Sequence, residues 1–177
     1  MGLRDAIKGW GSTAQERQTA LPCDALVPDP KSVLVRAVDV DAPPGHVYRW
    51  LCQLSVAPYS YDWIDNRGRR SPQRLVPGLE QLEVGQRFVA VFRLAEFEPG
   101  SRITLEQRGR LLGHVALTYA VFEREHGKSR LVLRIAWGPP RVPFARELLS
   151  AGDLVMARRQ LLNLKRLAER GGDGDGV

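Results

Sequence analysis

The chain has 177 residues, of which 44% are hydrophobic and 26% charged. This length is typical of one domain, which can bury enough surface to fold without disulfides or metals. The two cysteines, Cys23 and Cys52, are too few and too far apart for a disulfide framework or metal site. We therefore expect buried free thiols, no cofactor and a reducing cytoplasm. No apolar run has the length of a signal peptide or a membrane span.

The formal net charge is +6, from 26 Lys and Arg against 20 Asp and Glu. This charge is only partly concentrated, in two groups, one in a loop and one along the last predicted helix: Arg67, Arg69, Arg70 and Arg74, then Arg158, Arg159, Lys165, Arg166 and Arg170. Neither group is interleaved with aromatic residues, as a base-stacking surface would be. We expect solvated faces and no nucleic-acid partner.

The first 30 residues carry little periodicity and several prolines, which disfavour helix at the residue before each of them. They predict a partly irregular leader over residues 1–30, with one short helix near residues 4–10. Residues 33–40 are β-branched and mostly apolar, which predicts a strand packed against a core.

A proline pair, Pro43 and Pro44, suits the start of a helix because the second proline can occupy the first helical position. Apolar residues then recur at helical spacing through Val47, Leu51 and Leu54. Residues 59–66 are interpreted as a second short helix or a wrapped loop. Residues 67–86 are rich in glycine and proline and predict a long irregular connection.

The pattern changes to a period of two at Gln86, where apolar positions alternate through Phe88, Ala90, Phe92 and Leu94. Further strands are predicted over residues 103–108, 114–124 and 130–137. The intervening segments, residues 98–101 and 125–128, have the glycine and polar residues of hairpin turns. The strands should therefore pair in antiparallel order.

A final helix is predicted from about Ala151 to Arg170, opened by Ser150 with Asp153 three residues later, close to a capping box. It carries one apolar stripe, formed by Leu154, Ala157, Leu161, Leu164 and Ala168. The glycine-rich tail over residues 171–177 should be flexible.

This order predicts an α+β fold, with a curved antiparallel sheet of about six or seven strands and a long C-terminal helix on its concave face. Two short helices follow the first strand. A single helix covers a curved sheet incompletely, so we expect a cavity between them.

The sequence also resembles the START-like SRPBCC superfamily, and within it a bacterial subgroup of unassigned function. The resemblance lies in residues 21–24, 40–43, 47–51, 59–66, 82–85 and 158–161. It implies the helix-grip fold of the birch pollen allergen and of polyketide cyclase/dehydrase-like proteins, over a domain of residues 31–170. It further implies an apolar cavity for a lipid, a polyketide or another hydrophobic small molecule. Function on such a fold must be argued from the site.

Residues 58–66 hold three aromatic rings and two carboxylates without the period of a helix or strand, which is typical of a pocket wall. We expect the ligand to contact the mouth, the sheet wall and the helix lid through ten residues: Tyr59, Tyr61, Trp63, Phe88, Phe92, Tyr119, Trp137, Leu154, Arg158 and Leu161. Ordinary core packing is the alternative for each of them.

If the protein is an enzyme, the catalytic candidates are Tyr61, Asp62 and Tyr119, since a carboxyl near aromatic rings could transfer a proton. A cap or a partner of a nearby arginine is the plainer use of Asp62. Other titratable candidates are Asp65, Glu106 and His114, and the last two are expected at the surface. Three separated histidines predict no metal site.

Three functions stay open at this point. The first is binding of a hydrophobic small molecule by a monomer or homodimer. The second is a metal-independent cyclase or dehydratase acting on a polyketide-like substrate in the same cavity. The third is a protein-binding module that uses the basic helix and the arginine group.

Overall fold

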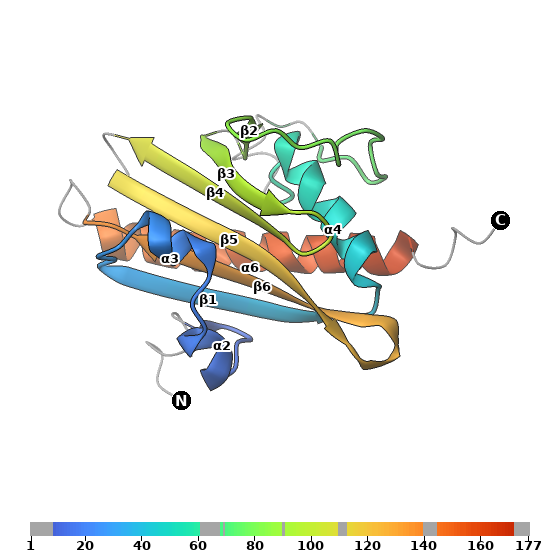
Figure 1. Ribbon diagram of the computed structural model, residues 1–177, viewed down its shortest axis with the longest axis horizontal. Helices are drawn as coiled ribbons and strands as arrows, with labels where there is room; N and C mark the ends of the chain where they lie inside the picture. Colours follow the sequence, from blue (N-terminus) through green and yellow to red (C-terminus); the bar gives the residue numbers. More distant parts are fainter. Residues whose placement is uncertain are drawn as a thin grey trace.

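The structure is a computed structural model that describes residues 9–60, 68, 70–89, 91–109, 113–139 and 145–171, with the backbone alone for residues 145–155. The predicted α+β fold is confirmed: a curved antiparallel sheet has the long helix α6 (Ala145–Gly171) on its concave face (Figure 1). None of the described helices combines the length and the apolarity needed to cross a membrane.

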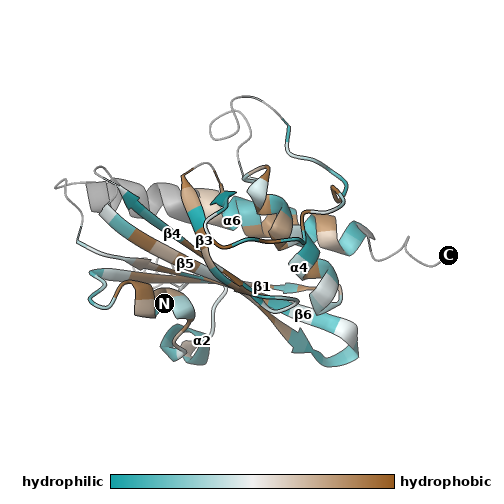
Figure 2. Ribbon diagram, turned by 45° about the horizontal axis from the view of Figure 1, so that its top comes forward, coloured by the Kyte–Doolittle hydropathy of each residue, from teal (hydrophilic) through white to brown (hydrophobic). Residues whose placement is uncertain are grey.

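Over the described residues the sheet has six strands, within the predicted number. They are β1 (Ser32–Val40), β2 (Arg87–Phe88), β3 (Phe92–Glu98), β4 (Arg102–Gly109), β5 (Gly113–Arg124) and β6 (Lys128–Trp137). Their order is β1-β6-β5-β4-β3-β2, and every neighbouring pair is antiparallel. Hydrophobic residues recur along β4 and β5, whereas the β5–β6 hairpin is hydrophilic (Figure 2). The predicted hairpin turns are confirmed.

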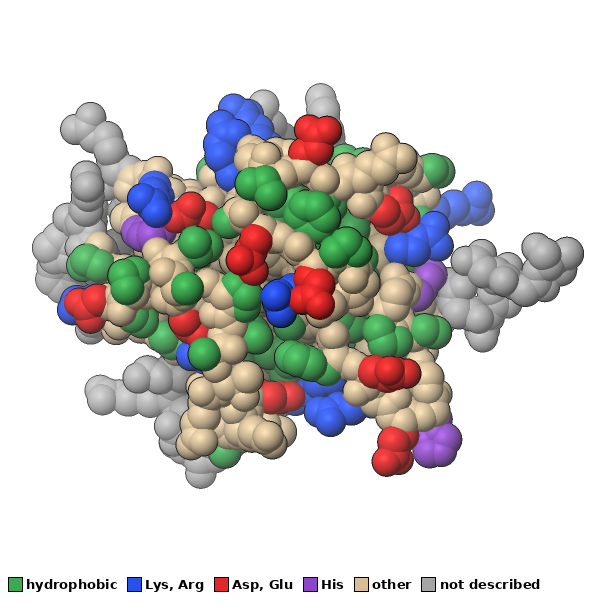
Figure 3. Space-filling view, in the orientation of Figure 1, with side chains coloured by type: hydrophobic (Ala, Val, Ile, Leu, Met, Phe, Trp, Pro, Cys, Tyr) green, Lys and Arg blue, Asp and Glu red, His purple; other side chains and the backbone are tan. Residues whose placement is uncertain are grey.

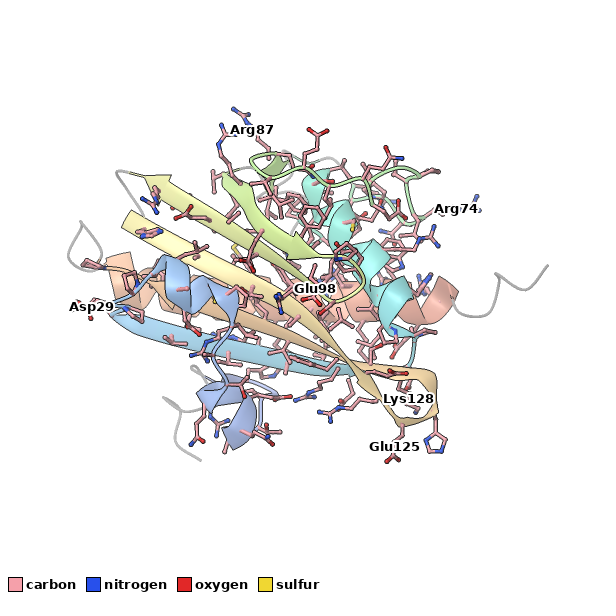
Figure 4. The ribbon with its side chains drawn as sticks, in the orientation of Figure 1. Asp29, Arg74, Arg87, Glu98, Glu125 and Lys128 are labelled. Carbon is pink, nitrogen blue, oxygen red and sulfur yellow. The ribbon has the colours of Figure 1, made fainter. Side chains whose placement is uncertain are left out.

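Five further short helices are described, three α-helices and two 3₁₀ turns. The first four are α2 (Ala14–Gln18) and α3 (Pro22–Leu26) before the sheet, then α4 (Pro44–Cys52) and the single 3₁₀ turn η1 (Gln53–Ser55) after β1. A second 3₁₀ turn, η2 (Glu125–Gly127), closes the β5–β6 hairpin; it begins at the labelled Glu125 and is followed by the labelled Lys128 (Figure 4). The predicted proline start of α4 is confirmed, with Pro44 in the first helical position.

The continuous strand predicted over residues 86–94 is wrong. The chain reverses after Phe88, so that Phe88 pairs with Phe92 across the β2–β3 hairpin, and Val89 has a φ of 37°. Opposed residues of a hairpin point to the same face, so the period of two runs through the turn without a visible break. The segment also lacks the Gly, Pro, Asn or Asp that normally indicates a turn.

The predicted start of the last helix is also wrong. Helix α6 begins at Ala145, so Ser150 and Asp153 lie inside the helix and form no cap at its start. The residues from Ala145 to Leu149 are mostly strong helix formers, which extends the helix in the N-terminal direction. Gly152 lies inside the helix, at a cost of about 1 kcal/mol relative to alanine.

The main core lies between the concave face of the sheet and helices α4 and α6. Its largest members that are almost fully buried are Tyr59, Phe88, Leu34, Leu51, Leu54, Leu94, Ile103, Leu105, Leu131, Leu133 and Leu161. On α6, Leu161, Leu164 and Ala168 face this core, as the apolar stripe predicts. The C-terminal half of α6 is therefore packed closely against the sheet.

The opposite, convex face of the sheet carries α2 and α3 (Figure 1). The backbone N–H of Cys23 donates to Thr118 Oγ1 at 3.1 Å, and that hydroxyl lies 3.0 Å from the hydroxyl of Thr104. Arg134 Nε donates to both carboxylate oxygens of Asp24, at 2.8 and 2.9 Å. In the space-filling view, acidic, basic and apolar side chains are interspersed on this face (Figure 3).

Glu16 on α2 binds the sheet through Arg130. The Nε and Nη2 atoms of Arg130 donate to the two Glu16 oxygens at 2.8 and 3.0 Å, and Nη2 also donates to Gly11 O at 2.6 Å. Glu16 completes a capping box with Thr13 as well. The hydrogen bond from Arg130 is the main reason that the pKa of Glu16 is lowered, in spite of its burial.

The free edge of β1 is covered by the residues that precede α2. The N–H of Ala37 donates to Trp10 O at 3.1 Å, and the Arg158 guanidinium of α6 stacks 5.3 Å from the centre of the Trp10 ring. Gly11 has a φ of 69°, and a Cβ there would lie 2.1 Å from Ala37 O. Only glycine allows the chain to pass this closely along the strand.

Candidate functional site

The segment after η1 reaches the core through Tyr59, which the sequence predicts at the mouth of a pocket. Tyr59 is almost fully buried, has a φ of 55°, and packs edge-on against Trp50 with ring centres 6.0 Å apart. A bulky residue in the left-handed region is strained and must be held by its surroundings. Asn163 of α6 helps to hold it, since its side chain donates to Tyr59 O at 2.9 Å.

Gln160 joins the sheet, the last helix and this segment. The Tyr119 hydroxyl donates to Gln160 Oε1 at 2.5 Å, and Gln160 Nε2 donates to Pro58 O at 2.6 Å. Both side chains are buried, Tyr119 within the apolar core. These two hydrogen bonds join the middle of α6 to β5 and to the segment after η1. Gln160 lies where the closely packed C-terminal half of α6 begins.

Arg36 is the least expected residue on the concave side. It is fully buried, and by strand alternation it lies on the same face of β1 as Leu34 and Val38. Leu133 separates it from Tyr119 in one row across β1, β6 and β5. A guanidinium stays charged at all ordinary pH values and has five N–H donors, more than one carboxylate accepts. Burying such a group in an apolar core is costly unless polar or charged groups lie next to it.

Two more polar atoms lie under the N-terminal half of α6. Gln107, Val115 and Trp137 form one row across β4, β5 and β6, on the concave face to which Val115 belongs. Gln107 Oε1 and Trp137 Nε1 are buried and have no hydrogen-bond partner in the part of the chain that the structure describes. A buried acceptor and a buried donor without partners are costly, which favours a polar ligand or water there.

Gly109 makes room for this arrangement. A Cβ at Gly109 would lie 2.3 Å from Gln107 Nε2, so the missing side chain lets the Gln107 amide extend toward the end of the strand. The row of Gln107 and Trp137 is four residues along β6 from the row of Tyr119 and Leu133, or roughly 13 Å. The polar groups of the concave face are thus spread over roughly the length of a small molecule, and we call the strip of the sheet from the Arg36–Tyr119 row to the Gln107–Trp137 row the trough.

The structure places the ten predicted ligand contacts in three ways. Six lie in or against the main core: Tyr59, Phe88, Phe92, Tyr119, Trp137 and Leu161. Arg158 is exposed and contacts Trp10 at the β1 edge. For Leu154 only the helical backbone is described, and Tyr61 and Trp63 lie outside the described residues, as do Asp62 and Asp65 among the acid-base candidates.

Glu106 and His114 lie on the convex face and away from the trough. His114 Nε2 lies 2.7 Å from Glu106 Oε1, and Arg108 Nε donates to the same oxygen at 2.8 Å. Burial raises the pKa of Glu106, but the hydrogen bonds from Arg108 and His114 outweigh it and lower the pKa overall. This cluster keeps Glu106 ionised, which suits an ion pair better than a general acid.

Three residues of the trough were missed in the sequence: Arg36, Gln107 and Gln160. Arg36 stands in a run that is otherwise a buried strand, and a charged residue at an inward position of such a strand was the available signal. The two glutamines are uncharged and gave no comparable signal.

The sequence matches no known protein-family profile and no curated protein. Its fold is similar to solved structures. The Zhui aromatase/cyclase from Streptomyces sp. R1128 is 19% identical with a TM-score of 0.55, over 82% of this chain and 98% of that one. The di-domain ARO/CYC BexL from the BE-7585A biosynthetic pathway is 19% identical with a TM-score of 0.55, over 78% of this chain and 47% of that one.

Protein MLL2253 from Mesorhizobium loti is 16% identical with a TM-score of 0.53, over 78% of this chain and 97% of that one. At these identities the likenesses concern the fold. They confirm the predicted helix-grip fold.

Proposed function

We propose that this protein binds an oxygenated hydrophobic small molecule, of the polyketide or aromatic phenol kind, between the N-terminal half of α6 and the concave face of the sheet. The observation that carries the proposal is a pair of buried atoms on that face, Trp137 Nε1 and Gln107 Oε1, neither of which has a hydrogen-bond partner among the described residues. A carbonyl or hydroxyl oxygen of the ligand would accept from the indole, and a ligand hydroxyl would donate to the amide oxygen.

The surroundings of this pair favour a mostly apolar ligand. Val115 lies between the two side chains, and the next row along the strands is formed by Leu105, Leu117 and Ile135. Small-molecule sites typically combine such walls with a few polar groups that fix orientation. The fold neighbours include proteins titled aromatase/cyclases, which is compatible with a ligand of this class.

A titration with 1-naphthol, followed by its fluorescence, tests the proposal. The neutral phenol should bind saturably, and Trp137→Phe should weaken binding roughly three- to ten-fold, since a net neutral hydrogen bond contributes about 0.5–1.5 kcal/mol. Naphthalene, which lacks the hydroxyl, should bind both proteins equally. Trp10→Phe is the matched control, because Trp10 lies at the β1 edge. Equal 1-naphthol affinity in the Trp137→Phe variant and the wild type would refute the assignment.

A second candidate is the cyclase or dehydratase, favoured by the row that holds Arg36 and Tyr119. A guanidinium fixed in an apolar site could stabilise the enolate of an aldol cyclisation, and Asp62 remains the candidate base. Turnover of a linear poly-β-ketone analogue, lost in Arg36→Met while 1-naphthol binding persists, would favour this reading over simple binding.

A further inference from the structure

A second hollow lies on the convex side of the sheet, opposite the trough. It has a volume of about 770 Å³ and lies between α2 and the β5–β6 hairpin. Side chains at even positions of β5 point to the convex face, since Thr118 binds α3 there, and Phe122 and Arg124 continue this series. Both residues line the hollow, together with the buried Val132 of β6. The hollow is therefore separate from the site proposed above.

The hollow forms because α2 is attached to the sheet by long polar side chains. None of the five residues of α2 is buried. Arg130 Nε donates to Glu16 Oε1 at 2.8 Å, and Arg134 Nη1 donates to Arg17 O at 3.0 Å. A helix with an apolar face would pack directly on the sheet, whereas these arginines hold α2 away from it. The space beside them is left open.

An aromatic ring is exposed in the hollow. Phe122 is 43% exposed, and Val132, Leu21 just before α3 and Ala14 of α2 add apolar surface around it. A single exposed apolar side chain is common on protein surfaces, but this ring stands in a concave place with apolar neighbours. A second ring, supplied by a ligand, would pack against Phe122 edge-on or offset and remove this surface from water.

A guanidinium beside this ring is loosely held. The side chain of Arg124 is 54% exposed, and within the described part of the chain its ion-pair partner is Glu16, with Nη2 and Oε1 4.0 Å apart. Glu16 is bound more closely by Arg130, at 2.8 and 3.0 Å. Glu123 also lines the hollow, but neighbouring side chains of a strand point to opposite faces, so its carboxylate points away from Arg124. Arg124 is therefore available to an anionic ligand.

We propose that this hollow binds a small aromatic carboxylic acid. The aromatic body would pack against Phe122 and Leu21, and the carboxylate would accept from Arg124, whose planar fork matches its two oxygens. The volume lies within the range of small-molecule sites. Because Glu16 is bound mainly by Arg130, Arg124 can turn to the ligand without releasing α2. Occupancy of this hollow does not require a ligand in the trough.

Isothermal titration calorimetry with 2-naphthoate at low salt tests the site, and saturable binding is expected. Arg124→Gln should weaken binding about two- to five-fold, the effect of losing a partly exposed ion pair. Phe122→Ala should weaken it at least about three-fold, because the ring contact is lost.

The matched controls remove the same kinds of group elsewhere. Arg87→Gln and Val91→Ala change exposed residues outside the lining, and Arg87 lies far from the β5–β6 hairpin (Figure 4). Each should leave the affinity for 2-naphthoate unchanged. Trp137→Phe should leave it unchanged as well, because Trp137 belongs to the trough. The outcome with 1-naphthol in the trough therefore does not decide this test.

Three results would overturn the proposal. The first is the absence of saturable 2-naphthoate binding, and the second is an equal loss in Arg124→Gln and Arg87→Gln. The third is a loss in Trp137→Phe with none in Arg124→Gln, which would place the compound in the trough. Tighter binding of N-acetyl-Gly-Phe than of 2-naphthoate, with the same dependence on the variants, would assign the hollow to the carboxyl terminus of a partner protein instead. Circular dichroism and thermal unfolding confirm that each variant is folded.

Discussion

Replacing Glu16 by Gln should destabilise the protein, because Glu16 joins α2 to the sheet through a two-point contact with Arg130. The side chains of Arg130 and Glu16 are only 8% and 13% exposed, so water screens the pair weakly. A hydrogen bond to a charged group contributes about 1.5–3 kcal/mol, and Gln keeps one of the two acceptors. We expect a loss of roughly 2–3 kcal/mol of unfolding free energy at pH 7, measured by urea denaturation.

The effect should depend on pH with a definite sign. The pKa of Glu16 is lowered in the folded state, so its contribution is complete above the ordinary carboxyl pKa of 4.5 and is lost as the pH falls through the lower, folded value. The wild-type and Glu16→Gln curves should therefore converge between pH 5 and about pH 3. Glu125→Gln, on the exposed hairpin, should change stability by less than about 0.5 kcal/mol. A loss of unfolding free energy in Glu16→Gln that is smaller than about 0.5 kcal/mol at pH 7, or that stays constant down to pH 3, would refute the reasoning.

Three other outcomes follow from the structure. Tyr119→Phe should lower the unfolding free energy by about 1–2 kcal/mol, because Gln160 Oε1 stays buried and loses this donor. Gln160→Leu should cost less in the Tyr119→Phe background than in the wild type, and strictly additive losses in urea denaturation would contradict this coupling. Gly11→Ala should release the residues before α2 from the sheet, seen as faster limited proteolysis there, and unchanged cleavage would argue against the close approach. Burial raises the thiol pKa values of Cys23 and Cys52 to about 11 and about 12, so neither should react with a disulfide reagent at pH 8 until the protein is unfolded.

The sequence predicts the sheet and the long helix well because both carry regular periods. The runs of apolar residues in β4, β5 and β6 and the stripe on α6 reflect burial: the inner faces of these strands and the stripe share the main core, and β5 and β6 are buried on their outer faces as well. The prediction was less accurate where the period does not change at a boundary. The reversal between Phe88 and Phe92 keeps the alternation intact, and α6 continues through Ser150 and Gly152.

The functional residues were harder to predict, because their roles depend on neighbours that are distant in the chain. Tyr119 was predicted as a candidate, but its partner Gln160 is uncharged and 41 residues away. Arg36 was hidden in an apolar run, and its burial is visible only once β1 is placed beside β6. The helices α2 and α3 have five residues each, too few to show a helical period.

The contact of Trp10 and Gly11 with Ala37 has a consequence for how this protein avoids self-association. A bare outer strand is a template on which another chain can add its own strand, and repeated addition leads to fibrils. Here Trp10 and Gly11 cover part of the exposed edge of β1 and so block the addition of another strand there. A truncated form that begins at Ser12 should lose this protection and aggregate with a concentration dependence that the full chain does not show.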